Sequence, residues 1–127
     1  MNYSISESEW KLMQVLWAHS PLALKDVIDQ VGPENHWNGN TVRTMLVRLV
    51  EKGAVTAQKQ GRNYLYSACA QEQECVLQET EHFLSRIFDG SPARLFSALS
   101  ASGKLSKQDC QEIEAMLREM KEREDHA

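Results

Sequence analysis

The sequence predicts a mainly α-helical protein in which three helices and a β-hairpin precede an all-helical region. Apolar residues recur at helical spacing over most of the 127 residues. The spacing of the apolar residues changes only after Gly53, where two short β-prone runs follow each other. Serine, proline and glycine stand where helices usually begin or end.

The first helix is expected to begin after Ser6. Ser6 and Glu9 fit the S-x-x-E capping box, in which each side chain accepts a hydrogen bond from the other residue's backbone N–H. The buried stripe of this helix would contain Trp10, Leu12, Met13, Leu16 and Trp17. A second helix, with Leu24, Val27, Ile28 and Val31 at helical spacing, is expected to end at "GPEN", residues 32–35.

A third helix is predicted over "NTVRTMLVRLVEKG", residues 40–53, with Asn38 as its N-cap. Its apolar stripe contains Val42, Met45, Leu46, Leu49 and Val50, and Gly53 ends it. The opposite face carries Asn40, Thr44, Val47 and Glu51, flanked by Thr41, Arg43 and Arg48.

The runs "AVTAQKQ" and "RNYLYSA", joined near Gly61, predict a β-hairpin. Three helices followed by a hairpin, with a polar and basic third helix, are typical of an N-terminal winged helix-turn-helix domain over residues 1–70. An ordinary small α+β domain is the alternative, because many small folds share this pattern.

Residues 71–127 predict an all-helical dimerisation domain. Three helices carry apolar stripes but few aromatic residues, so this half is not expected to close a core alone. Packing against a second copy would bury the stripes. The residues expected at that interface are Phe83, Ile87, Leu95, Leu99, Ile113, Leu117 and Met120.

Charge is distributed unevenly along the chain. The formal net charge is −4, but residues 35–66 hold five basic side chains against Glu51 alone. A local basic patch, rather than the total charge, decides whether DNA phosphates are attracted. The acidic N-terminal segment does not fit a signal peptide, and no apolar run approaches the roughly 20 residues of a membrane helix. We therefore expect a cytoplasmic protein.

"TVRTMLVRLVEKG" resembles the recognition helix of the BlaI/MecI/CopY family of bacterial repressors. "ISESEWKLMQVLW" is similar to that family's first helix, and "TEHFLSRIFDGSPARLFSAL" and "LSKQDCQEIEAMLREM" resemble its dimerisation region. The resemblance implies a winged-helix repressor that binds double-stranded operator DNA as a homodimer. It also implies inverted-repeat operators, commonly with TACA/TGTA half-sites.

Two departures from the family leave the inducing signal open. Ala98-Leu99 stands where the β-lactam repressors are cut at an Asn-Phe bond. Only Cys110 lies where the copper repressors have paired C-x-C motifs, which excludes a copper–thiolate site of that kind. Cleavage by a sensor or protease partner, a ligand or metal at the dimer, and cysteine oxidation are the alternatives. We favour cleavage or partner-driven release, because "SALSASGK" is expected to form a loop that ends a helix.

The residues predicted to contact DNA are Asn40, Thr41, Arg43, Thr44, Val47, Arg48, Lys59 and Arg62. Thr44 could offer its hydroxyl to a base or its methyl to thymine, and Val47 could meet a thymine methyl or be an ordinary surface residue. Arg43 could instead pair with an acidic residue of the second helix. Lys52 is expected to supply only charge.

No cofactor or catalytic site is predicted. The sequence contains no G-x-S-x-G, phosphate-loop or H-E-x-x-H motif, so we do not expect an enzyme. Cys75, Glu79 and His82 share one helix face and could hold a metal, but a buried thiol beside polar surface residues is the favoured interpretation. A thiol- or metal-responsive regulator of the same fold, or a winged-helix module that binds protein rather than DNA, are the alternative functions.

Overall fold

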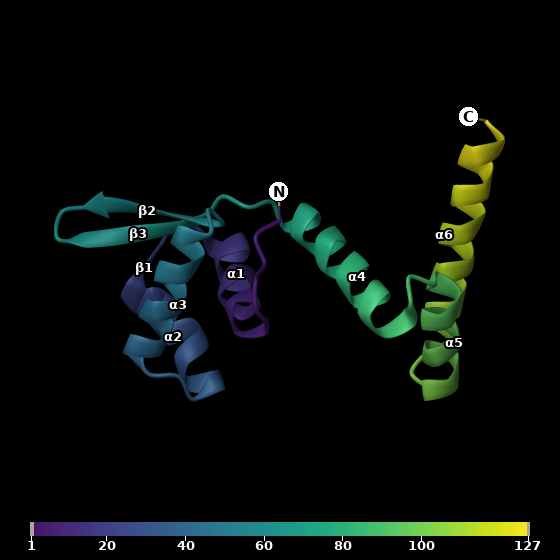
Figure 1. The fold of residues 1–127 in the computed structure, drawn as a ribbon, viewed down its shortest axis with the longest axis horizontal. Helices are drawn as coiled ribbons and strands as arrows, with labels where there is room; N and C mark the ends of the chain where they lie inside the picture. The colour runs from purple at the N-terminus through teal and green to yellow at the C-terminus, as the bar shows by residue number, and fades with distance from the viewer. Residues whose placement is uncertain (1, 127) are drawn as a thin grey trace. The chain divides into compact units, whose positions relative to one another are not determined.

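The computed structural model describes residues 2–126 and divides the chain into two compact units, residues 1–79 and 80–127. It confirms the mainly helical prediction (Figure 1). The elements, in chain order, are α1 (Glu7–His19), β1 (Leu22–Ala23), α2 (Leu24–Asn35), α3 (Gly39–Glu51), β2 (Val55–Gln60), β3 (Asn63–Ala68), α4 (Glu72–Phe88), α5 (Pro92–Ser102) and α6 (Lys107–Asp125).

Helix α1 begins where the capping box predicts. Ser6 Oγ accepts a hydrogen bond from the Glu9 N–H at 3.1 Å, and Glu9 Oε1 accepts one from the Ser6 N–H at 2.9 Å. Two backbone donors that the first helical turn leaves unpaired are thereby satisfied. The predicted start of the first helix is confirmed.

Helix α2 extends further than expected. The segment 32–35 was predicted to end this helix, but it forms the last turn, with Pro33 inside it. Proline removes only one hydrogen bond so close to a helix end. The Asn35 amide donates to the Val31 carbonyl oxygen at 2.8 Å, and the helix stops at His36, which has a positive φ of 57°.

The core of the first unit lies between the three helices and the base of the hairpin. Its largest fully buried side chains are Leu12, Met13, Leu16, Val27, Val42, Leu46, Leu49 and Val55. The first turn of α4 adds the buried Cys75 to the same cluster. The compact first unit therefore includes the start of α4, and the domain boundary at residue 70 stays a prediction.

Three antiparallel strands in the order β1-β3-β2 form the sheet. The predicted hairpin is confirmed: Gln60 pairs with Asn63 at its tip, next to Gly61 with a φ of 63°. Figure 1 shows this hairpin extending past the helices of the first unit as a wing. Strand β1, which pairs with β3 through Leu22 and Ala23, was not predicted, because two residues are too short to show a pattern.

The second unit is entirely helical. Ser91 caps α5, with Pro92 in its first turn, and a Ser106–Asp109 capping box begins α6. Residues 97–104 were expected to be largely loop, and this was wrong. Helix α5 continues to Ser102 and ends at Gly103, which has a φ of 73°. Ala98-Leu99 therefore lies inside a helix.

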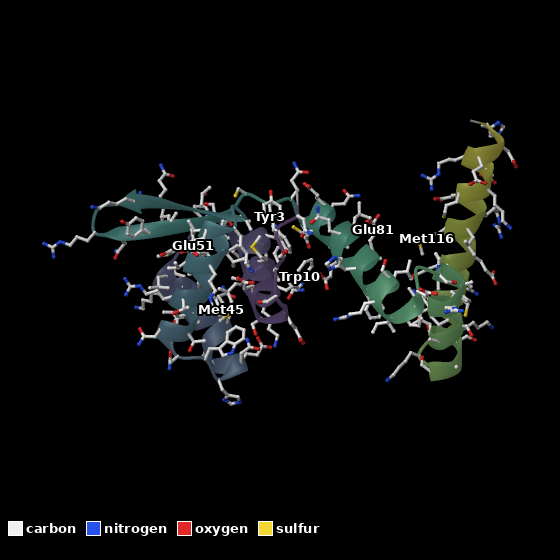
Figure 2. The ribbon with its side chains drawn as sticks, viewed as in Figure 1. Tyr3, Trp10, Met45, Glu51, Glu81 and Met116 are labelled. Carbon is white, nitrogen blue, oxygen red and sulfur yellow. The ribbon has the colours of Figure 1, made fainter. Side chains whose placement is uncertain are left out.

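No residue of the second unit within 80–126 is buried. Large apolar side chains on α4, α5 and α6 remain exposed, among them Met116, which Figure 2 labels. None of the helices in residues 2–126 combines the length and the hydropathy that a membrane span requires.

Candidate nucleic-acid interface

Helix α3 presents one buried and one exposed face. Asn38 caps its N-terminus, where Asn38 Oδ1 accepts the Thr41 N–H at 2.9 Å, as predicted. Val42, Met45, Leu46 and Leu49 are buried. Because this apolar stripe fixes the rotation of the helix about its axis, the opposite side chains must point into solvent.

The exposed face collects the side chains predicted to contact DNA. Asn40, Thr41, Arg43, Thr44, Val47 and Arg48 are all exposed, and we call this set the DNA-reading face. Val47 is 47% exposed and is the apolar member of this set. In Figure 2 the labelled Met45 and Glu51 mark the buried and exposed sides of the same helix. A helix with a free polar face of this length suits the major groove, which is wide enough to admit it.

Both threonine hydroxyls of this face are already engaged. Thr44 Oγ1 donates to the Asn40 carbonyl oxygen at 2.8 Å. Thr41 Oγ1 donates to Asn38 Oδ1 at 3.1 Å. Each bond restricts the rotamer of its threonine, so these side chains are held in place before any DNA arrives.

The two arginines of the DNA-reading face are available for phosphates or base edges. Neither Arg43 nor Arg48 forms an ion pair with any residue in 2–126. The alternative in which Arg43 pairs with an acidic residue of the second helix is therefore not seen. Guanidinium groups can bind guanine edges or phosphates through two parallel hydrogen bonds.

Lys52 has a structural role that the sequence did not reveal. It was expected to supply only charge, but its Nζ lies 2.5 Å from Glu9 Oε1 and 2.9 Å from the Ser4 carbonyl oxygen. Glu9, the one buried charged residue within 2–126, is only 2% exposed. This ion pair connects the C-terminal end of α3 to the start of α1, and so anchors the helix that carries the DNA-reading face.

The environment of Glu9 favours its charged form. Burial raises the pKa of this carboxyl, but hydrogen bonds from Lys52 and Ser6 and the charge of Lys52 outweigh burial. The net effect lowers the pKa below its ordinary value of 4.5. The other carboxylate oxygen, Oε2, is buried and has no hydrogen-bond partner among residues 2–126. The carboxylate therefore depends on Lys52 for most of its compensation.

The wing supplies further cations. Lys59 and Arg62 are exposed on the hairpin, as predicted, and Arg62 follows the glycine of the turn. Tyr64 lies opposite Lys59 in the strand register and is 46% exposed, whereas Tyr66 is buried. Tyr64 therefore belongs to the exposed surface of the wing.

The three side chains considered as metal ligands, Cys75, Glu79 and His82, do not form a metal site. Cys75 is buried in the core of the first unit, whereas Glu79 and His82 are exposed. No group of three His, Cys, Asp or Glu side chains within residues 2–126 could hold a metal ion. Burial raises the pKa of the Cys75 thiol, as does the charge of Glu74 to a smaller extent, which makes it a poor thiolate ligand.

The residues predicted at a dimer interface remain solvent-accessible in the single chain. Phe83, Ile87, Leu99, Leu117 and Met120 are exposed, and Leu95 and Ile113 are half-buried. Phe96 and Met116 of the second unit are exposed as well. Soluble proteins rarely leave so many large apolar side chains on a small unit without a partner to cover them.

Comparison with known proteins identifies relatives over most of the chain. Residues 5–119 match the family model described as penicillinase repressor. The penicillinase repressor of Bacillus licheniformis is 30% identical over 119 residues, which cover 94% of this chain and 93% of that protein. The methicillin resistance regulatory protein MecI of Staphylococcus aureus is 23% identical over 115 residues, which cover 91% and 94% respectively.

A solved protein–DNA complex is similar to part of this chain. It is the solution structure of the monomeric form of Bacillus licheniformis BlaI in complex with the blaP half-operator. Its similarity to this chain has a TM-score of 0.50 at 35% identity and covers 56% of this chain and 87% of that one.

Proposed function

This chain belongs to the penicillinase repressor (BlaI/MecI) family, and we propose that its homodimer represses transcription by binding an inverted-repeat operator in double-stranded DNA. The family consists of DNA-binding transcription regulators, so the chain is not an enzyme. Its place of action would be the cytoplasm, where bacterial operators lie.

The observation that carries this proposal is the exposed face of α3. Asn40, Thr44 and Val47 stand opposite the buried stripe, and Arg43 and Arg48 flank them without acidic partners in residues 2–126. Base edges would meet the centre of the face, and phosphates or guanines would meet its flanks. Lys59 and Arg62 of the wing would add phosphate or minor-groove contacts.

Homodimerisation is supported by the exposed apolar residues of the second unit. Two copies that cover each other's α4, α5 and α6 stripes would bury them and give a protein with two-fold symmetry. Such a dimer presents two DNA-reading faces, which explains why an inverted repeat would be the preferred site. Family resemblance favours TACA/TGTA half-sites.

Release from DNA is proposed to require a partner. A sensor or protease acting on the second unit would separate the copies and lower operator affinity. Because Ala98-Leu99 lies within α5, a cut at that bond would need local unwinding of this helix first. The segment that ends α5 and precedes α6, residues 103–106, is the more accessible target.

Selection from a random-sequence duplex pool tests the proposal. The intact protein is expected to enrich one sequence with two inverted half-sites, and we call the tightest-binding duplex the selected operator. Enrichment of no sequence, or of a single unrepeated half-site, would contradict dimeric sequence-specific binding.

Arg48→Ala should weaken binding to the selected operator by about 1–3 kcal/mol, and Thr44→Ala by about 1 kcal/mol. Both side chains are exposed, so the free energy of unfolding should change by less than about 0.5 kcal/mol. Mobility shifts and thermal unfolding measure the two quantities. Arg94→Ala, which removes one positive charge from an exposed site on α5, is the control and should bind like the native protein. Native affinity in both α3 variants would show that this face does not contact bases.

A further inference from the structure

The hydroxyls of the DNA-reading face have no hydrogen left to donate. A carbonyl oxygen can only accept, so Thr44 Oγ1 must use its one hydrogen in the 2.8 Å bond to the Asn40 oxygen. Asn38 Oδ1 also accepts the Thr41 N–H at 2.9 Å, which identifies it as the amide oxygen, so the Thr41 hydroxyl is likewise a donor to it. Neither hydroxyl can donate to a base unless an existing bond breaks.

What Thr44 can offer DNA is therefore its γ-methyl group and an accepting oxygen. The bond to Asn40 restricts the side-chain rotamer and holds that methyl in place on an exposed residue. Val47 lies three residues further along the helix, a neighbour on the same surface, and adds two more methyl groups. Thr44 and Val47 together make a methyl strip in the middle of the DNA-reading face, between Arg43 and Arg48.

We propose that this methyl strip reads the C5 methyl groups of thymines in the major groove. The inference rests on the proposed function, since it requires α3 to lie in that groove. Thymine is the one standard base that presents a methyl group there, and guanine presents only acceptors, to which Thr44 cannot donate. Preference for thymine opposite the strip then comes from apolar contact, and hydrogen-bonded readout is left to Asn40 and the two arginines.

An alternative role for Thr44 makes a different prediction. Its oxygen could accept a hydrogen bond from the amino group of adenine or cytosine. That contact would not depend on any thymine methyl, and it would be kept by serine but lost in valine. Methyl readout has the opposite dependence, because valine keeps methyl groups at this position and serine has none.

Uracil substitution in the selected operator separates the two roles. Deoxyuridine differs from thymidine only by the missing C5 methyl, so replacing thymines one at a time removes single methyl groups without altering base pairing. At thymines that face the strip, the native protein should lose about four-fold in affinity per methyl, the effect of burying about one carbon. Thymines elsewhere in the same duplex serve as internal controls and should show no loss.

Side-chain variants complete the test. Thr44→Val should bind the thymine operator within about two-fold of the native protein and should still discriminate against uracil. Thr44→Ser should bind more weakly and should lose the discrimination at the thymine that Thr44 faces. Val47→Ala should lose the discrimination between thymine and uracil at a neighbouring thymine. Thermal unfolding confirms that all three variants are folded, as expected for exposed positions.

The outcomes show whether methyl readout alone fails or the proposed function fails with it. If the native protein binds the selected operator specifically but every uracil duplex equally well, methyl readout is wrong and the proposed function stands. Loss of affinity in Thr44→Val but not in Thr44→Ser would also overturn it, in favour of the accepting oxygen. If no duplex is bound above background, the proposed function and this inference both fail.

Discussion

Leu117→Asp should convert the protein to a monomer and lower its affinity for the selected operator by on the order of 100- to 10,000-fold. Leu117 is 49% exposed on α6, on the same stripe as Ile113 and Met120. A carboxylate at this position would have to be buried without a partner when two copies associate. Without the dimer, the second half-site is no longer held at high effective concentration, and the gain from two linked contacts is lost.

Light scattering and mobility shifts measure the two consequences of Leu117→Asp. Ala115→Asp is the matched control, since it adds the same charge on the opposite face of α6. This control should remain dimeric and bind the operator like the native protein. A monomeric native chain, or a dimeric Leu117→Asp variant with native affinity, would contradict an interface on this stripe.

Lys52→Met should lower the free energy of unfolding by about 3 kcal/mol at neutral pH. The methionine keeps most of the side-chain volume but removes the cation and the hydrogen bonds to Glu9 and Ser4. Breaking a buried pair by removing one partner costs about 3–5 kcal/mol, and partial exposure of Lys52 places this site at the lower end. Lys59→Met on the exposed wing is the control and should change stability by less than about 0.5 kcal/mol. Chemical denaturation measures the free energy of unfolding of both variants.

The destabilisation by Lys52→Met should depend on pH, because it acts through the charge of Glu9. In the native protein the pKa of Glu9 is lowered when the chain folds, so its contribution is fully present above about pH 4.5. It is lost as the pH falls from there through the lowered folded value. In Lys52→Met, burial should instead raise the folded pKa of Glu9 above 4.5, so the destabilisation should shrink on acidification. A stability difference that is the same at neutral and acidic pH would show that Lys52 does not act through Glu9.

Local patterns were enough to predict most of the fold. The capping residues Ser6 and Asn38 lie where predicted, because a cap involves only the residues of the next turn. The hairpin followed from its β-prone runs and Gly61. The last turn of α2 was missed because Gly32 and Pro33 usually stop helices, but they can lie in a last turn. The end of α5 was missed because its small and polar residues 100–102 were taken for a loop.

Contacts between residues far apart in the sequence could not be predicted from local patterns. Strand β1 exists because it pairs with β3, more than 40 residues later in the chain. Two residues are too few to predict that pairing from the sequence. The bond between Glu9 and Lys52 likewise joins the first and third helices, so Lys52 could not be distinguished from the solvated lysines. The exposed face of α3 was predictable from helical periodicity, but the engaged hydroxyl of Thr44 was not, since a threonine in a helix can adopt either of two rotamers.

If the exposed face of α3 reads base sequence, the protein must distinguish two duplexes that differ only in sequence. Fluorescence anisotropy should be measured with the intact native protein, on the selected operator and on a duplex of scrambled sequence with the same composition, at one physiological salt concentration. The native protein should bind the operator at least about 1,000-fold more tightly than the scrambled duplex. Arg48→Ala should reduce this affinity ratio, and Arg94→Ala should leave it unchanged. Equal affinity for the two duplexes, or a ratio unaffected by Arg48→Ala, would contradict sequence reading by this face.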